Sequence, residues 1–105
     1  MNTMKPGALK LALMITLALG LNSAANADDV AARYGKTCAV CHASGAAGAP
    51  KTGDAAAWKP RMDKGMDTMV KSVENGLNAM PPKGMCFDCS ADEYKALINY
   101  MATAK

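Results

Sequence analysis

Apolar side chains recur at helical spacing in three segments of the chain, and each segment predicts a helix. Residues 66–75 carry four of them at i, i+3, i+4 and i+7, namely Met66, Met69, Val70 and Val73. Residues 29–38 repeat the pattern at intervals of four with Val30, Tyr34 and Cys38. The last helix begins at the capping-box sequence 90–93, and its apolar face comprises Tyr94, Leu97, Ile98 and Met101.

The segments between these helices are rich in residues that interrupt regular structure. Residues 43–53 are a loop by composition, and Asp54 is expected to cap a short helix that Pro60 kinks or ends. Residues 78–89 contain two prolines, a glycine and two cysteines, so they are expected to be irregular. Because no segment alternates polar and apolar residues as a strand does, the sequence predicts an all-α fold.

The first 27 residues have the pattern of a secretory signal peptide. Lys5 and Lys10 are basic, the run from Leu11 to Leu21 is apolar, and residues 25–27 match the small-x-small cleavage site. The apolar run is too short for a bilayer-spanning helix, which takes about 20 residues. We expect cleavage after Ala27, export to the periplasm, no stable membrane insertion afterwards, and a single domain at residues 28–105.

The predicted domain is small and nearly neutral. Once Lys5 and Lys10 are removed, its basic and acidic side chains leave a net charge of +1. This charge argues against nucleic acid as a partner, because nucleic-acid-binding domains are usually strongly basic. A domain of this size rarely folds on its apolar core alone. A bound group that fills the interior is therefore expected.

Cys38-Ala39-Val40-Cys41-His42 is the attachment signature of a c-type haem. Two thiols separated by two residues reach the two vinyl groups at one porphyrin edge, and the adjacent imidazole then lies beneath the ring and binds iron. We expect one covalently attached haem c per chain, held by Cys38, Cys41 and His42.

Two other chemistries would also use these cysteines. A thioredoxin-like redox pair needs a βαβ context, which the helical pattern does not provide. A zinc site built from all four cysteines would need an unusually long separation between the two pairs, and export favours oxidised thiols. The haem is favoured over both.

His42 is the only histidine, so two histidines from one protomer cannot ligate the iron. Most methionines at helical spacing are explained by core packing. Met80 differs because it precedes Pro81 and Pro82, whose fixed φ angles keep its loop from collapsing. Met80 is the expected sixth ligand, and Met85 is its rival. A thioether opposite an imidazole raises the reduction potential of the iron.

Cys86 and Cys89 remain after the haem takes the other two thiols. In an exported protein this even remainder predicts one disulfide, with a switchable dithiol as the alternative. A ring this short adds only about 2 kcal/mol by the loop-entropy estimate, so the bridge is expected to shape the turn before Ser90.

Three segments, CAVCHASGAAGAPKTGD, AAAWKPRM and AMPPKGMCFDCSADE, together resemble the class I cytochromes c, and specifically the cytochrome c5 group. The resemblance implies a helical wrap around one haem with His42 and Met80 as axial ligands. It also implies that the Pro50 carbonyl orients the His42 imidazole, and that Trp58 and Arg61 lie near the haem propionates. Thr52 stands where a bulkier residue is often found.

These observations predict a one-electron carrier between respiratory proteins rather than an enzyme. The expected partners are a terminal oxidase, a reductase or a multihaem cytochrome, and the expected state is a monomer or weak homodimer. Lys51, Lys59 and Lys83 are candidates for the rim of the docking edge. The alternative is a five-coordinate haem sensor or peroxidase-like enzyme, with Met80 off the iron.

Overall fold

The computed structural model describes residues 27–105, which form five α-helices and two short 3₁₀ turns. The elements are α1 (Ala27–Lys36), α2 (Ala39–His42), η1 (Ala46–Gly48), α3 (Ala55–Met62), α4 (Met66–Asn75), η2 (Pro82–Met85) and α5 (Ala91–Thr103). Within this range no strand forms, and the β-type pairing is limited to one bridge between Leu77 and Met80. The predicted all-α class is confirmed. The predicted signal peptide, 1–27, lies outside the described residues except for Ala27.

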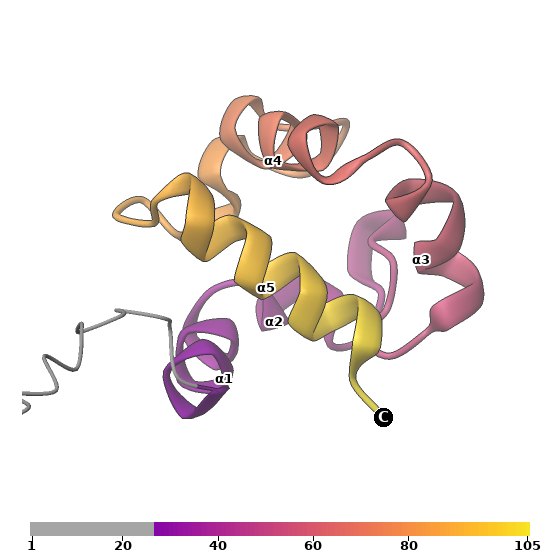
Figure 1. The fold of residues 1–105 in the computed structure, drawn as a ribbon, viewed down its shortest axis with the longest axis horizontal. Coiled ribbons are helices and arrows are strands. Elements are labelled where there is room, and N and C mark those ends of the chain that lie inside the picture. The colour runs from indigo at the N-terminus through magenta and orange to yellow at the C-terminus, as the bar shows by residue number, and fades with distance from the viewer. Residues whose placement is uncertain (1–26) are drawn as a thin grey trace, which may run out of the picture.

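Helix α5 is the central element of the fold. It packs against α1, α3 and α4, and Figure 1 shows it crossing the molecule with α1 on one side and α4 on the other. Its inward face is the predicted one, since Tyr94, Leu97, Ile98 and Met101 are all buried. The other buried apolar side chains come from α3, α4 and the loop before α5, namely Trp58, Met69, Val70 and Cys86.

The bounds of two helices follow from the signals in the sequence. Helix α4 covers the predicted residues 66–75, and Gly76 ends it with a φ of 84°, which a residue with a side chain rarely adopts. Helix α5 begins after Ser90, whose Oγ accepts a hydrogen bond from the Glu93 N–H at 3.2 Å.

Helix α1 is shorter at its C-terminus than the predicted 29–38, because it ends at Lys36. The Thr37 hydroxyl donates to the Arg33 carbonyl at 2.7 Å, and the Thr37 N–H bonds to the Tyr34 carbonyl instead of continuing the helical ladder. The chain therefore turns before Cys38. The cysteine motif begins a new short helix, α2, rather than ending the first one.

Pro60 does not end helix α3, which continues to Met62. The carbonyl that loses its helical partner through Pro60 belongs to Ala56, an exposed residue that water can satisfy. The cap at the start of this helix is the expected one, because Asp54 accepts a hydrogen bond from the Ala57 N–H at 3.2 Å.

None of the helices within residues 27–105 has the length and hydropathy needed to cross a bilayer.

Candidate functional site

The cysteine motif forms one tight turn that directs three reactive side chains to the same cavity. The His42 N–H bonds to the Cys38 carbonyl at 2.9 Å, and the Cys41 N–H contacts the same oxygen at 3.3 Å. Cys38 and Cys41 are free thiols and partly exposed. Burial raises the pKa of the Cys38 thiol, with the Thr37 hydroxyl acting in the opposite direction.

The cavity beside this turn has a volume of about 460 Å³, which is within the usual range of ligand sites. Its lining comes from every part of the fold except α1, and most of it is apolar. The residues singled out in the sequence meet there, namely Cys38, Cys41, His42, Pro50, Trp58, Arg61 and Met80.

The His42 imidazole is buried and fixed on two sides. Its Nδ1 lies 2.8 Å from the Pro50 carbonyl oxygen, and its ring stacks on Trp58 with the centroids 5.6 Å apart. Because a carbonyl only accepts, Nδ1 carries the proton and Nε2 keeps its lone pair. This is the tautomer that a metal ligand needs, and the carbonyl is the kind of partner that orients one.

The loop that carries Pro50 is itself held by contacts that the sequence did not reveal. The Thr52 N–H donates to the His42 carbonyl at 2.8 Å, and the Thr52 hydroxyl lies 2.7 Å from the Tyr34 hydroxyl. Tyr34 in turn packs against Tyr100 of α5, with ring centroids 5.0 Å apart. The smaller residue at position 52 thus gains a hydrogen bond that ties α1 to the loop.

Met80 lines another wall of the same cavity, on the loop between α4 and η2. Its backbone exchanges two hydrogen bonds with Leu77, at 2.9 and 3.0 Å, so the four residues 77–80 form a closed turn. A β-carbon on Gly84 would lie 2.8 Å from Cε of Met80, and Gly84 is buried with a φ of 54°. Gly84 is therefore a site residue that sequence reasoning missed. Its place in the Met-Pro-Pro-Lys-Gly sequence was the available signal.

Met85, the rival ligand, also lines the cavity, but its side chain is half exposed. It lies at the mouth together with Val40 and Leu77, which are also large, apolar and exposed. Met80 is the better buried of the two candidates.

Trp58 and Arg61 both line the cavity, and each already has a hydrogen-bond partner in the backbone. The Trp58 Nε1–H donates to the Lys51 carbonyl at 2.9 Å, and Arg61 Nη1 donates to the Ala57 carbonyl at 2.6 Å. In this geometry Trp58 contributes its packed ring, whereas Arg61 still has further N–H groups for an anion.

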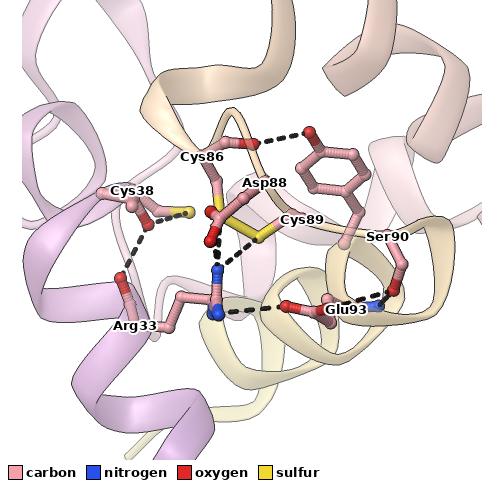
Figure 2. Close-up of a disulfide and its surroundings, with 9 residues drawn as sticks. Arg33, Cys38, Cys86, Asp88, Cys89, Ser90 and Glu93 are labelled. Carbon is pink, nitrogen blue, oxygen red and sulfur yellow. Dashed lines mark hydrogen bonds and ion pairs between the residues drawn. A yellow bond between two sulfur atoms is a disulfide. The ribbon is translucent and has the colours of Figure 1, made fainter.

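The second pair of cysteines lies away from the cavity lining and forms a bridge. Cys86 and Cys89 are joined as a disulfide immediately before the cap of α5, and Arg33 and Glu93 lie beside it (Figure 2). The Tyr94 hydroxyl donates to the Cys86 carbonyl at 2.8 Å, which attaches the bridged turn to the core.

The side chains of this cavity fit a covalently attached haem. One wall offers an imidazole with its lone pair free and two thiols on a single turn, and the other offers a thioether. The remaining lining is mostly apolar, as a porphyrin face requires. Imidazole with thioether is a donor set of the electron-transfer cytochromes.

Comparison with known proteins gives matches over most of the chain. A family model described as cytochrome c oxidase, cbb3-type, subunit III matches residues 25–101. A cytochrome c5 of Azotobacter vinelandii is 52% identical over 81 residues, which cover 75% of this chain and 94% of that protein. A mono-heme ferrocytochrome c from Shewanella putrefaciens is 56% identical, with a TM-score of 0.65 over 72% of this chain and 94% of the other. A cytochrome c in an electron transfer complex with nitrite reductase is 40% identical, with a TM-score of 0.62 over 69% and 88% of the two chains.

Proposed function

Because the chain belongs to the class I cytochrome c family and its relatives include cytochrome c5, we propose that it carries single electrons between respiratory proteins in the periplasm. It is an electron-transfer protein rather than an enzyme. One observation supports the detailed proposal above all others. Two side chains that could hold a haem iron, the imidazole of His42 and the thioether of Met80, line one apolar cavity from different elements.

Each of the four principal residues has one task in this proposal. Cys38 and Cys41 would hold the haem through thioether bonds, His42 would bind the iron through Nε2, and Met80 would bind it through its sulfur. The haem supplies a reversible one-electron couple when bound. The Pro50 carbonyl holds the proton on Nδ1 of His42 and keeps the ring in place whichever charge the site carries.

The protein docks its partners at the mouth of the cavity. Val40, Leu77 and Met85 are exposed there, where a desolvated contact would bring a partner close to the thioether edge. Transient redox interfaces are small, so this patch is sufficient for an encounter. The candidate partners are a terminal oxidase, a reductase or a multihaem cytochrome, and a structural relative is found in complex with nitrite reductase.

Export by a signal peptide cleaved after Ala27 is part of the proposal. Cleavage there removes the first residue of α1 and leaves Asp28 and Asp29 in the first turn of the helix. Negative charge at a helix N-terminus is favourable, so these two carboxylates still stabilise the start of the helix after processing.

The test is the optical spectrum of the haem-loaded protein, oxidised and reduced, with and without carbon monoxide. We expect a weak red sulfur-to-iron band in the oxidised form and no binding of carbon monoxide. Met80→Ala should abolish the band and admit carbon monoxide, whereas the matched control Met85→Ala should leave both unchanged. Prompt carbon monoxide binding by the unmodified protein would contradict the carrier and favour the open-site sensor or enzyme.

A further inference from the structure

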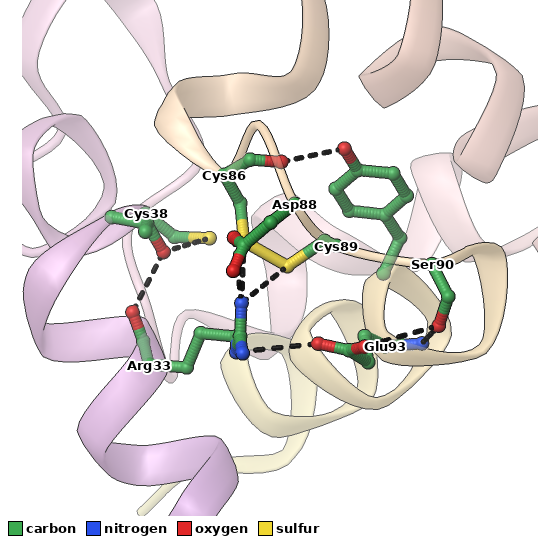
Figure 3. Close-up of polar contacts among 9 residues, drawn as sticks. Arg33, Cys38, Cys86, Asp88, Cys89, Ser90 and Glu93 are labelled. Carbon is green, nitrogen blue, oxygen red and sulfur yellow. Dashed lines mark hydrogen bonds and ion pairs between the residues drawn. A yellow bond between two sulfur atoms is a disulfide. The ribbon is translucent and has the colours of Figure 1, made fainter.

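The Cys86–Cys89 bridge has a cationic partner from a distant part of the chain. Arg33 Nη1 lies 3.4 Å from Sγ of Cys86 and 3.5 Å from Sγ of Cys89, as Figure 3 shows. The same nitrogen donates to Asp88 Oδ1 at 3.0 Å, and Nε pairs with Glu93 Oε2 at 3.3 Å. A disulfide sulfur is uncharged and a weak acceptor, so a guanidinium stabilises a closed bridge only slightly. The same guanidinium stabilises a negatively charged thiolate much more.

We propose that the Cys86–Cys89 bridge is a thiol–disulfide exchange site that accepts two electrons from a protein dithiol, with Arg33 stabilising the thiolate released by Cys86. This goes beyond the one-electron role proposed for the haem and does not depend on it.

The two sulfurs differ in access, and the difference selects the one that is attacked. Cys86 is 1% exposed, whereas Cys89 is partly exposed. The two residues between them, Phe87 and Asp88, are both exposed. An incoming thiolate therefore reaches Cys89, and Cys86 is the leaving group.

The exchange balances in two steps. The partner's thiolate attacks Sγ of Cys89, a new sulfur–sulfur bond forms there, and the electron pair of the broken bridge goes to Sγ of Cys86. The partner's second thiolate then attacks its own bonded sulfur and releases Cys89. The partner ends as a disulfide, and two protons from its thiols complete the thiols of Cys86 and Cys89.

The position of Cys86 favours a dithiol over a single thiol. After the first step its thiolate remains three residues from the mixed disulfide on Cys89 and can attack it again. A monothiol is expelled by that reaction. A dithiol has a second sulfur already tethered at the site, so it completes the reduction first.

Acidic groups also lie beside these sulfurs, so a thiolate on Cys86 depends on Arg33 for its stabilisation. Asp88 belongs to the bridged turn and Glu93 to α5, and both would repel a thiolate. Tyr94, from the core side, stays neutral because burial and then the carboxylates, Glu74 first among them, raise its pKa. The remaining neighbour, the Cys38 sulfur, carries no charge once it is a thioether. Arg33 is thus the cation that offsets the two carboxylates facing the bridge.

The experiment measures the reduction of the bridge in the haem-loaded protein at defined ratios of reduced to oxidised dithiothreitol. Free thiols are trapped by alkylation and counted by mass, with the iron kept reduced by ascorbate. Cys38 and Cys41 cannot react as thioethers, so the count reports on the bridge alone. Four trapped thiols would instead show that haem attachment has failed, which separates this test from that of the proposed function.

Arg33→Gln should lower the equilibrium constant for reduction about tenfold at pH 8.5, equivalent to about 30 mV for two electrons. The difference from the unmodified protein should be smaller at pH 7, because Arg33 acts on the thiolate and not on the neutral thiol. The equilibrium constant of Arg33→Lys should lie between those of Arg33→Gln and the unmodified protein. Asp88→Asn should shift the constant severalfold in the opposite direction, since it removes a carboxylate that competes for the guanidinium.

Three results would overturn the proposal. One is a bridge in the unmodified protein that resists excess dithiothreitol. Another is an equilibrium constant for reduction that stays within twofold of the unmodified value in both Arg33→Gln and Asp88→Asn. That result would show that Arg33 pairs with the carboxylates and does not act on the sulfurs. The third is reduction by glutathione as fast as reduction by dithiothreitol at matched thiolate concentration, which would remove the preference for a dithiol.

Discussion

The two walls of the cavity are built in different ways. On one wall His42 is buried, sits in a regular helical turn, and is held by hydrogen bonds to its ring and to its backbone. On the other, Met80 belongs to a loop whose neighbours Asn78, Lys83 and Met85 all have positive φ. That wall is mostly exposed, and Gly84 makes room for the Met80 side chain.

The difference indicates where the site is rigid and where it yields. The first wall keeps its geometry through many local bonds, so the loss of one of them leaves the ring in place. The second depends on a few backbone conformations that only glycine adopts without cost. We expect the thioether to leave the iron long before the imidazole does, and before the helices unfold.

The largest effect should follow from removing the attachment points on the first wall. Cys38→Ser combined with Cys41→Ser should yield a chain without covalent haem and without most of its helical circular dichroism signal. The reason is that core residues such as Met69, Ile98 and Met101 line the cavity, and a domain this small has little other core. Haem staining of the denatured protein and far-ultraviolet circular dichroism would check it.

The matched control for this change is Cys86→Ser combined with Cys89→Ser, which should keep the covalent haem and most of the helicity. Native helicity in the chain that lacks both attachment cysteines would contradict the view that the bound group completes the core.

An intermediate effect is expected from Gly84→Ala on the second wall. The new methyl group meets Cε of Met80 at 2.8 Å, and alanine is strained at a φ of 54°. We expect a loss of about 1–3 kcal/mol in the free energy that keeps Met80 on the iron. The measurement is a guanidinium titration that follows the sulfur-to-iron band and the helical signal separately, and the band should disappear first.

Gly35→Ala is the control for that substitution, because no atom lies within 4 Å of its added β-carbon and it belongs to a regular helix. It should leave the band unchanged. Equal midpoints for the band and the helices in Gly84→Ala would show that the two walls are equally rigid.

The smallest effect is expected from Thr52→Val on the first wall. This change leaves the Tyr34 hydroxyl without its partner at 2.7 Å and should lower the free energy of unfolding by about 1 kcal/mol. The sulfur-to-iron band should stay in place until the protein unfolds. A double-mutant cycle with Tyr34→Phe would isolate the bond, and early loss of the band in Thr52→Val would contradict the rigidity of this wall.

Much of the fold could be predicted because its signals are local. The bounds of α4 and the cap of α5 follow from periodicity, Gly76 and Ser90, which act within a few residues of one another. One error was local as well, because the predicted end of α1 ignored the hydrogen bond from Thr37 back to Arg33. Of the two outcomes expected at Pro60, the end of the helix does not occur, since an exposed carbonyl tolerates the loss of its partner.

Some parts of the candidate site could be predicted and others could not. The spacing of Cys38, Cys41 and His42 was sufficient to predict haem attachment, because two thiols and an imidazole on one turn match one edge of a haem. Met80 could be singled out by its prolines. Gly84 belongs to the same Met-Pro-Pro-Lys-Gly sequence, but only the structure shows that it makes room for the Met80 methyl group.

By itself, the sequence determined most of the helices and the cysteine–histidine motif, and it singled out His42 and Met80 as candidate ligands, since each of these depends on residues that are close along the chain. Only the tertiary structure decided which distant groups meet. Thr52 bonds to Tyr34, and Arg33 lies against a bridge more than fifty residues away. Such contacts arise because the packing of α1 against α5 brings the segments together, and no local spacing encodes them.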